Sequence, residues 1–257
     1  MYDCQGANSM TVTVDDDGIL DLLPSDIERG RYRSLVVSLQ AYAHLFRDQR
    51  VLDFGASWGT SAVALLRAGA RHVIGIEPSS ERVAQGHDLI RALDLEEHIS
   101  LFHISDTRRL PWADDQFPFV LANGVVEHIP RPARLEILRE VWRLIAPAGH
   151  FMITETPNSY FPRDQHTTQL WFNHWLPERW AHRRAVRAGA FRAERTDWAS
   201  SGWRGAGYYE LVRPLRGASL VPETLTRTRQ RLLSWIGLPP MLIDPWPIWV
   251  FRKRVGP

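Results

Sequence analysis

The first pattern in the chain that could do chemistry comes directly after an apolar run. It consists of the five residues Gly55-Ala56-Ser57-Trp58-Gly59. The spacing G-x-S-x-G is that of a nucleophile elbow, in which a serine attacks a carbonyl carbon. An elbow needs a sheet beneath it and a loop of oxyanion donors upstream, and only a helical pattern and a polar stretch precede this turn. Glycines after a buried strand also let the backbone pass close to a cofactor. We favour the cofactor turn.

The kind of cofactor is indicated by Glu77, which follows the next apolar run, 18 residues after Gly59. An acid at this place can accept hydrogen bonds from both hydroxyls of a ribose. The dinucleotide pattern G-x-G-x-x-G would require glycine where Ser57 and Thr60 stand. The sequence therefore argues against a pyrophosphate cradle and predicts a nucleoside cofactor without phosphates.

The elements that must position these residues alternate along the chain. Apolar runs predict strands over 50–54, 72–76, 99–104, 119–122 and 150–154, and helical spacing predicts helices over 25–48, 61–68, 80–93 and 132–145. Ala148-Gly149 is expected to close the last of these helices. Strands that alternate with helices indicate an α/β fold with a doubly wound parallel sheet, whose ligands bind at the carboxyl ends of the strands.

Composition narrows the class of protein. The 257 residues include a single cysteine, Cys4, which excludes an internal disulfide framework and suits a reducing cytoplasm. We see no secretory signal, and prolines interrupt the most apolar late stretch, 232–251, so we predict a cytoplasmic protein without a transmembrane segment. Residues 1–24 are expected to form a flexible arm and residues 25–257 a single domain. Residues 1–130 contain 11 Lys/Arg and 19 Asp/Glu, whereas residues 131–257 contain 20 and 10.

Five segments carry a resemblance to a known family. VLDFGASWG, IGIEPSS, SDTRRLPWADDQFPFV, LANGVVEHIPRP and LIAPAGHFMITETP are similar, in order and spacing, to class I S-adenosylmethionine-dependent methyltransferases. The chain most resembles the branch that includes the ubiquinone-biosynthesis O-methyltransferases and many natural-product enzymes, over about residues 48–158. This resemblance implies a mostly parallel seven-stranded sheet, closed by IWVFR at 248–252. Residues 159–247 would then carry a helical, aromatic-rich, substrate-facing insertion.

The resemblance also implies S-adenosylmethionine as the cofactor and S-adenosylhomocysteine as its product. It assigns Asp53, Gly55, Ala56, Ser57 and Gly59 to the turn against the methionine part, and Glu77 and Pro78 to the ribose site. It assigns Asp106 and Thr107 to the adenine site, and Asn123 and Gly124 to the site of the sulfonium. Ser57 departs from the family pattern, which has glycine there.

Transfer of a methyl group to a hydroxyl requires a base or a metal, because the hydroxyl must lose its proton. Glu127-His128 is the leading candidate, and His166, in the polar run after the fifth strand, is a further catalytic candidate. The similar segment of the ubiquinone enzymes reads E-x-x-E-H and holds a divalent metal. Gly124 replaces the first glutamate here and leaves two of the three ligands, so we assign no metal site, leave metal dependence open and expect a metal-free base at His128. In the alternative, His128 only satisfies backbone groups at a helix start.

A polar run after the fifth strand leaves the predicted ligand-binding edge of the sheet. We expect substrate contacts from five residues in and beyond it: Asn158, Tyr160, Asp164, Trp171 and Trp175. Loop capping by Asn and Asp explains part of the same composition. Tryptophans and arginines interleave over 170–190, and we favour core packing of a helical lid with the arginines in water. Contact with a membrane surface stays open, and we expect no nucleic-acid partner.

The sequence thus predicts an S-adenosylmethionine-dependent methyltransferase that acts on a small molecule, with a hydroxyl of a sugar, a lipid-linked intermediate or a secondary metabolite as acceptor. Two alternatives stay open: a protein of this fold that catalyses another reaction, and a non-catalytic binding protein. The acceptor and the oligomeric state are not indicated.

Overall fold

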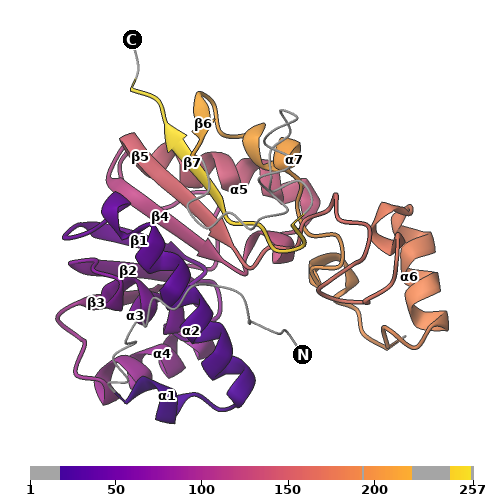
Figure 1. Ribbon diagram of the computed structural model, residues 1–257, viewed down its shortest axis with the longest axis horizontal. Coiled ribbons are helices and arrows are strands. Elements are labelled where there is room, and N and C mark those ends of the chain that lie inside the picture. Colours follow the sequence, from indigo (N-terminus) through magenta and orange to yellow (C-terminus); the bar gives the residue numbers. More distant parts are fainter. Residues whose placement is uncertain (1–17, 193, 222–243, 256–257) are drawn as a thin grey trace.

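The computed structural model describes residues 18–192, 194–221 and 244–255. Figure 1 shows a twisted sheet covered by helices and, at one end of the strands, a smaller lobe that carries α6. Cys4, the rest of residues 1–17 and most of the apolar stretch 232–251 lie outside the described residues.

The sheet has seven strands in the order β3-β2-β1-β4-β5-β7-β6. From β3 to β5 neighbouring strands pair in parallel, whereas β7 pairs antiparallel with both β5 and β6. The strands are β1 (Arg50–Phe54), β2 (His72–Glu77), β3 (Ile99–His103), β4 (Phe117–Asn123), β5 (Ile145–Thr154), β6 (Ala218–Leu220) and β7 (Trp249–Lys253). The predicted doubly wound, mostly parallel sheet is confirmed.

Two apolar layers hold helices against the two faces of this sheet. The helices are α1 (Ile19–Leu22), α2 (Asp26–Ala41), α3 (Thr60–Arg67), α4 (Ser80–Ala92), α5 (Arg131–Leu144), α6 (Glu178–Arg187) and α7 (Tyr208–Val212), with short 3₁₀ helices η1 (Ala43–Leu45), η2 (Val126–His128), η3 (Asn173–Trp175) and η4 (Trp198–Ser200). Val51 packs in the layer of α1 to α4, and its neighbour Leu52 in the layer of α5 and α7. Successive strand residues point to opposite faces, so a strand covered on both faces reads as one continuous apolar run.

The N-terminal boundary of the fold differs from the prediction. Residues 18–24 were expected in a loose arm, but α1 forms there and buries Ile19 and Leu20 in the core. The helix expected over 25–48 ends at Ala41, and η1 follows it. The polar residues that precede this short apolar run led to the prediction of an arm, although the run packs in the core.

The boundary between α5 and β5 is also corrected. Ala148-Gly149 was expected to end the helix, but β5 begins at Ile145 and contains both residues. Ala148 has a φ of 62°, and its partner strand is irregular between Phe117 and Phe119, where Pro118 interrupts the ladder. A proline cannot donate a ladder hydrogen bond and is tolerated at such an irregularity. The pair of small residues therefore marks a kink within a strand.

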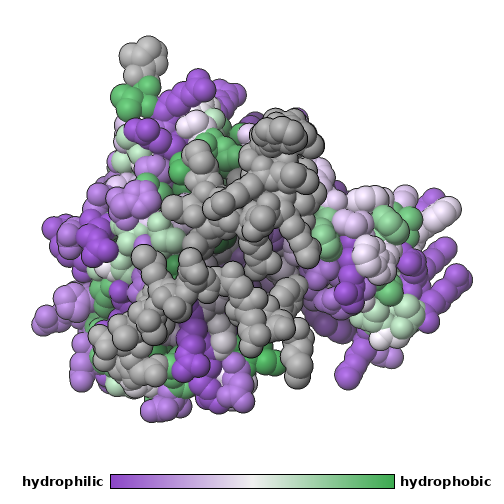
Figure 2. All heavy atoms as spheres, in the orientation of Figure 1, coloured by the Kyte–Doolittle hydropathy of each residue, from purple (hydrophilic) through white to green (hydrophobic). Residues whose placement is uncertain are grey.

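The lobe around α6 has its own small core, formed by Ala181, Ala185, Phe191, Trp198 and Trp203. Four aromatic residues that we expected to pack in this lobe instead expose about half of their surface: Trp171, Phe172, Trp175 and Trp180. Side chains of α6 appear largely hydrophilic in Figure 2. The range 159–247 also contains β6, which pairs with β7 in the sheet, and α7, whose Leu211 packs in the apolar layer on one face of the sheet. None of the helices in the described part of the chain combines the length and hydropathy that a membrane span requires.

Candidate active site

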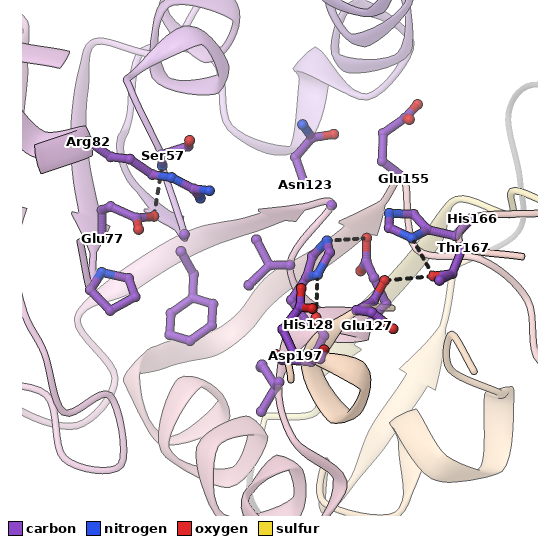
Figure 3. A pocket seen from close by; sticks show the side chains of 18 of the residues that line it. Ser57, Glu77, Arg82, Asn123, Glu127, His128, Glu155, His166, Thr167 and Asp197 are labelled. Atoms are coloured by element: carbon purple, nitrogen blue, oxygen red, sulfur yellow. Dashed lines mark hydrogen bonds and ion pairs between the residues drawn. The ribbon is translucent and has the colours of Figure 1, made fainter. Parts of the chain in front are cut away.

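A single large cavity follows the carboxyl ends of β1, β2 and β4 and continues under the loops that come after β5. Figure 3 shows its two ends, with Ser57 and Glu77 at one end and Glu127, His128 and His166 at the other. Asn123 lies between them. Most of the predicted site residues therefore lie around one cavity.

The turn after β1 places backbone amides against Glu77. The backbone N–H of Ser57 donates to Oε2 of Glu77 at 3.1 Å, and the N–H of Ser79 donates to Oε1 at 3.1 Å. Gly55 and Gly59 have φ values of 81° and 88°, which glycine adopts without strain. A side chain at Gly55 would place its Cβ 2.5 Å from Cγ2 of Val125. The turn thus presents a fixed carboxylate to the cavity.

Three residues assigned to the methionine part of the cofactor, Asp53, Ala56 and Gly59, are buried and do not line the cavity. Asp53 and Ala56 are fully buried. The hydroxyl of Ser61 donates to Oδ2 of Asp53 at 2.6 Å. Oδ1 accepts no hydrogen bond from the part of the chain that the structure describes. Burial, with a smaller contribution from the charge of Glu77, raises the pKa of Asp53 to about 7.

The predicted adenine residues diverge. Thr107 lines the cavity, as does Pro78 of the predicted ribose site, whereas Asp106 turns toward Arg108 and forms an ion pair with it at 2.8 Å. The hydrogen bonds from Arg108 lower the pKa of Asp106 to about 2. Its carboxylate is exposed on the outer surface beside a second, shallower pocket.

The middle of the cavity is formed by the end of β4. Asn123 and Gly124 line it, and Gly124 has a φ of 64°. The hydroxyl of Thr154 donates to Oδ1 of Asn123 at 2.8 Å, and the N–H of Gly124 donates to the carbonyl of Thr154 at 2.9 Å. These bonds tie β4 to β5 where the sheet ends.

Glu127 and His128 form η2, directly after β4. Glu127 is 2% exposed, and its Oε2 accepts a hydrogen bond from the hydroxyl of Thr156 at 2.8 Å. Burial raises the pKa of Glu127 to about 7. Nδ1 of His128 lies 2.8 Å from the carbonyl oxygen of Ser200. A carbonyl oxygen only accepts, so Nδ1 carries the proton and Nε2 of the neutral ring keeps its lone pair.

His166 joins η2 from a loop after β5. Its ring centroid lies 5.1 Å from that of His128. Loss of solvation in the cavity, and then the neighbouring His128, lowers the pKa of His166. The three side chains Glu127, His128 and His166 each offer one ligand atom, and these atoms all lie within 4.8 Å of one another.

Three of the predicted substrate residues hold the loop together. Asp164 is 4% exposed and accepts hydrogen bonds from the backbone N–H groups of residues 166, 167 and 168 and from the hydroxyl of Thr168. Asn158 is buried, and its amide donates to the carbonyl of Asp244. The hydroxyl of Tyr160 lies 3.4 Å from the N–H of Tyr209. Neither these residues nor Trp171 and Trp175 line the cavity.

The cavity also includes residues that the sequence analysis did not single out. They come from α2, from the segment after β5, from the loop between α6 and η4, and from the start of the last described segment: Glu28, Arg31, Tyr32, Leu35, Glu155, Phe191, Arg192, Arg195, Asp197, Ser200, Ser201 and Trp246. The signals for them were the helical spacing of Leu35 in α2 and the place of Glu155 at the start of the polar run after the fifth strand. The loop residues carry no periodicity, because their positions depend on contacts far along the chain.

Part of the chain is similar to known methyltransferases. Residues 51–149 match the family model described as a methyltransferase domain. The methyltransferase GfsG of Streptomyces halstedii is 32% identical over 106 residues, which are 41% of this chain and 37% of that protein. The 27-O-demethylrifamycin SV methyltransferase of Amycolatopsis mediterranei is 28% identical over 104 residues, 40% of this chain and 37% of that protein. Residues 51–149 thus match a methyltransferase domain, which supports the resemblance to class I S-adenosylmethionine-dependent methyltransferases over that part of the chain.

The aligned part spans less than half the length of these two curated relatives. Among solved structures, the [4+2]-cyclase SpnF superposes with a TM-score of 0.56 at 19% identity, and the alignment covers 87% of this chain and 81% of that one. This likeness shows that the methyltransferase fold extends over most of the chain.

The residues at the Glu77 end of the cavity fit the cofactor that the resemblance implies, S-adenosylmethionine. In a phosphate cradle, the amides of the turn would point at an anion. Here the N–H of Ser57 donates to the carboxylate of Glu77, so the turn offers acceptors for ribose hydroxyls instead of donors for phosphates. Each carboxylate oxygen has further lone pairs beyond the one that its backbone amide uses. A nucleoside cofactor without phosphates suits this chemistry.

Proposed function

We propose that the protein transfers the methyl group of S-adenosylmethionine to a hydroxyl oxygen of a small molecule that binds at the Glu127–His128–His166 end of the cavity. Glu77 would hold the ribose hydroxyls, Ser57 and Gly55 would lie against the methionine part, and Asn123 and Gly124 would stand beside the sulfonium. The observation that carries the proposal is a single cavity that joins a ribose-type carboxylate to a cluster of proton-accepting side chains.

The residues divide the work of such a transfer. The bound cofactor supplies an activated methyl group, so the protein must align the acceptor oxygen and receive its proton. As the new C–O bond forms and the S–C bond breaks, the hydroxyl proton must leave toward a basic atom. Nε2 of His128 keeps its lone pair, and the buried carboxylate of Glu127 lies 3.8 Å from it. This end of the cavity therefore has the groups that a hydroxyl acceptor needs.

A relative's name supports oxygen as the acceptor atom. The 27-O-demethylrifamycin SV methyltransferase, by its name, acts on an oxygen of a natural product. For this chain, a sugar, a lipid-linked intermediate and a secondary metabolite are the proposed acceptor classes.

The test is a transfer assay with S-adenosylmethionine labelled in its methyl group and a panel of hydroxyl, amine and carbon acceptors. We expect label in a hydroxyl compound and S-adenosylhomocysteine in equal amount. Label only in amines would contradict the oxygen assignment. Tight binding of S-adenosylhomocysteine without transfer to any acceptor would favour a different reaction on the same fold.

A further inference from the structure

Glu127, His128 and His166 converge at the acceptor end of the cavity although they come from separate segments. Glu127 and His128 belong to η2 after β4, and His166 comes from a loop beyond β5. Their ligand atoms lie within 4.8 Å of one another, and Figure 3 shows the side chains facing one another. Two imidazoles and a carboxylate make a donor set that a cluster of acidic residues does not offer.

Both imidazole rings are oriented by hydrogen bonds on the far side of the cluster. Nδ1 of His128 donates to the carbonyl oxygen of Ser200 at 2.8 Å. The hydroxyl of Thr167 donates to the carbonyl of Ser201, so Nδ1 of His166 must act as the donor in its 3.2 Å contact with that hydroxyl. Each ring therefore carries its proton on Nδ1 and keeps a free lone pair on Nε2. Outer hydrogen bonds of this kind are typical of histidines that bind metals.

The carboxylate of Glu127 is also held by a hydrogen bond from a residue outside the cluster. Oε2 accepts from the hydroxyl of Thr156 at 2.8 Å, and Oε1 lies 3.8 Å from Nε2 of His128. The side chain is 1% exposed, so its charge has little contact with water. A bound cation is one way to compensate the burial of a carboxylate, beside hydrogen bonding and protonation.

We propose that Glu127, His128 and His166 bind one divalent ion of the first transition row, in preference to magnesium. Two imidazole nitrogens with one carboxylate suit zinc, cobalt or iron(II), whereas magnesium prefers oxygen ligands. Ligands at about 2.1 Å from a tetrahedral ion lie about 3.4 Å apart, so small ring rotations close the set. His166 thus supplies the third ligand at a site where Gly124 has no side chain to offer.

The backbone at Gly202 leaves room for this arrangement. A Cβ at Gly202 would lie 2.7 Å from Nδ1 of His166 and 3.2 Å from Cγ of Glu127. Gly202 has a φ of 81°, which a residue with a side chain adopts only with strain. Alanine at this position would therefore push His166 and Glu127 out of the geometry that the ion requires.

The role of the ion, unlike its binding, rests on the proposed function. Three protein ligands leave a coordination position open, which is typical of catalytic sites. A Lewis acid at this place would lower the pKa of an acceptor hydroxyl and orient its oxygen. The three side chains would then act as ligands, in place of the metal-free base expected from the sequence.

The binding experiment uses the full chain after dialysis against a chelator, with no acceptor present. Cobalt(II) is added while its visible absorption bands are recorded, and zinc is then added as a competitor. The variants are His166→Gln and Gly202→Ala, with His87→Gln as the control, because His87 is an exposed histidine on α4. Titration with S-adenosylhomocysteine on the same samples reports whether each variant is folded.

We expect one cobalt ion per wild-type chain, displaced by one zinc ion and not by a tenfold excess of magnesium. Affinity should fall at least about 10-fold in His166→Gln and in Gly202→Ala and stay unchanged in His87→Gln. Equal cobalt affinity in wild type and both site variants would overturn the proposal, as would displacement by magnesium. Intact S-adenosylhomocysteine binding without cobalt binding would overturn the metal site and leave the proposed function standing. Cobalt binding without S-adenosylhomocysteine binding would contradict the function alone.

Discussion

The two ends of the cavity are built in different ways. At the cofactor end, Ser57 and Glu77 are 20 residues apart. Ser57 lies in the turn after β1, and Glu77 is the last residue of β2, which pairs in parallel with β1. At the acceptor end, His128 and Ser200 are 72 residues apart and belong to two 3₁₀ helices. The regular sheet positions the first pair, whereas loops and short helices position the second.

This difference teaches how the fold can serve many acceptors. Parallel strands bring their carboxyl ends to one edge, so the turn and Glu77 meet wherever the sheet forms. The loops at the other end carry few constraints from the sheet and can change while the sheet is kept. Changes at one end should therefore leave the other end's binding intact, and the following variants test that separation.

The largest effect is expected from His128→Ala. Removing this imidazole should lower turnover about 1,000-fold, whether it acts as a base or as a ligand, because the hydroxyl proton loses its route. The affinity for S-adenosylhomocysteine should change less than about 2-fold, since Glu77 and the turn are untouched. Steady-state kinetics and calorimetry on the same preparation measure both quantities.

His87→Gln, on the exposed face of α4, is the control for a histidine removed elsewhere. Equal losses of turnover and of nucleoside affinity in His128→Ala would break the separation between the two ends.

Asp53→Asn probes the buried acid beneath the cofactor turn. Because the folded-state pKa is raised to about 7 from 3.8, the folded protein binds the proton more tightly than the unfolded chain. The free energy of unfolding should therefore fall as pH rises from about 4 to 7 and then level off, by at most about 4 kcal/mol for this group. Asparagine should remove this decline. Urea denaturation at pH 5 and pH 8 compares the two proteins, and an identical decline in both would contradict the assignment.

Arg134, on α5, holds η2 and the segment around α7 together. Its guanidinium donates to the carbonyls of Ile129 and Gly205 and pairs with Glu210 at 2.9 Å, while only 4% of the side chain is exposed. Arg134→Met should reduce the free energy of unfolding by about 3 kcal/mol, because it leaves buried carbonyls and a carboxylate without their partner. Turnover of the folded protein should fall, and nucleoside affinity should not.

Arg131→Met is the matched control, since Arg131 pairs with the same carboxylate at 3.3 Å but is 48% exposed. An exposed pair of this kind contributes less than about 1 kcal/mol. If the two variants lose equal stability in thermal unfolding, burial is not what makes Arg134 important.

The smallest effect is expected from Gly55→Ala. The φ of 81° and the contact with Val125 should cost about 2 kcal/mol of stability and weaken nucleoside binding. Gly30→Ala in α2 is the control: an added Cβ meets no described atom within 4 Å, and alanine should stabilise the helix by about 0.5–1 kcal/mol. Chemical denaturation measures both. Equal stability of Gly55→Ala and wild type would contradict the close approach of the turn to Val125.

The sequence indicated that the turn after β1 and Glu77 lie at one edge of the sheet, because the signals for both are local. The apolar runs of β1 and β2, the glycines after Phe54 and the acid at Glu77 occur at a spacing that one βαβ unit sets. The directions in which the side chains point could not be predicted from the sequence. Asp53 is buried beneath the turn and Asp106 turns toward Arg108, and neither orientation follows from spacing.

At the acceptor end, the sequence indicated Glu127, His128 and His166 as separate candidates but not their meeting. Their convergence depends on Ser200, Ser201 and Gly202, which lie in an aperiodic segment. Asp164 was expected to contact a substrate, but its carboxylate accepts four hydrogen bonds within the loop. Polar loop residues that bind and those that brace the backbone have the same composition, so sequence alone does not separate them.

The central claim is that Glu77 marks the nucleoside end of one cavity, and calorimetric titration with S-adenosylhomocysteine tests it most directly. Wild type should bind in the micromolar range. Glu77→Ala should bind about 100-fold more weakly, because it loses two charge-assisted hydrogen bonds to the ribose. His128→Ala in the same experiment should bind like wild type. No binding to wild type, or equal binding to wild type and Glu77→Ala, would contradict the account.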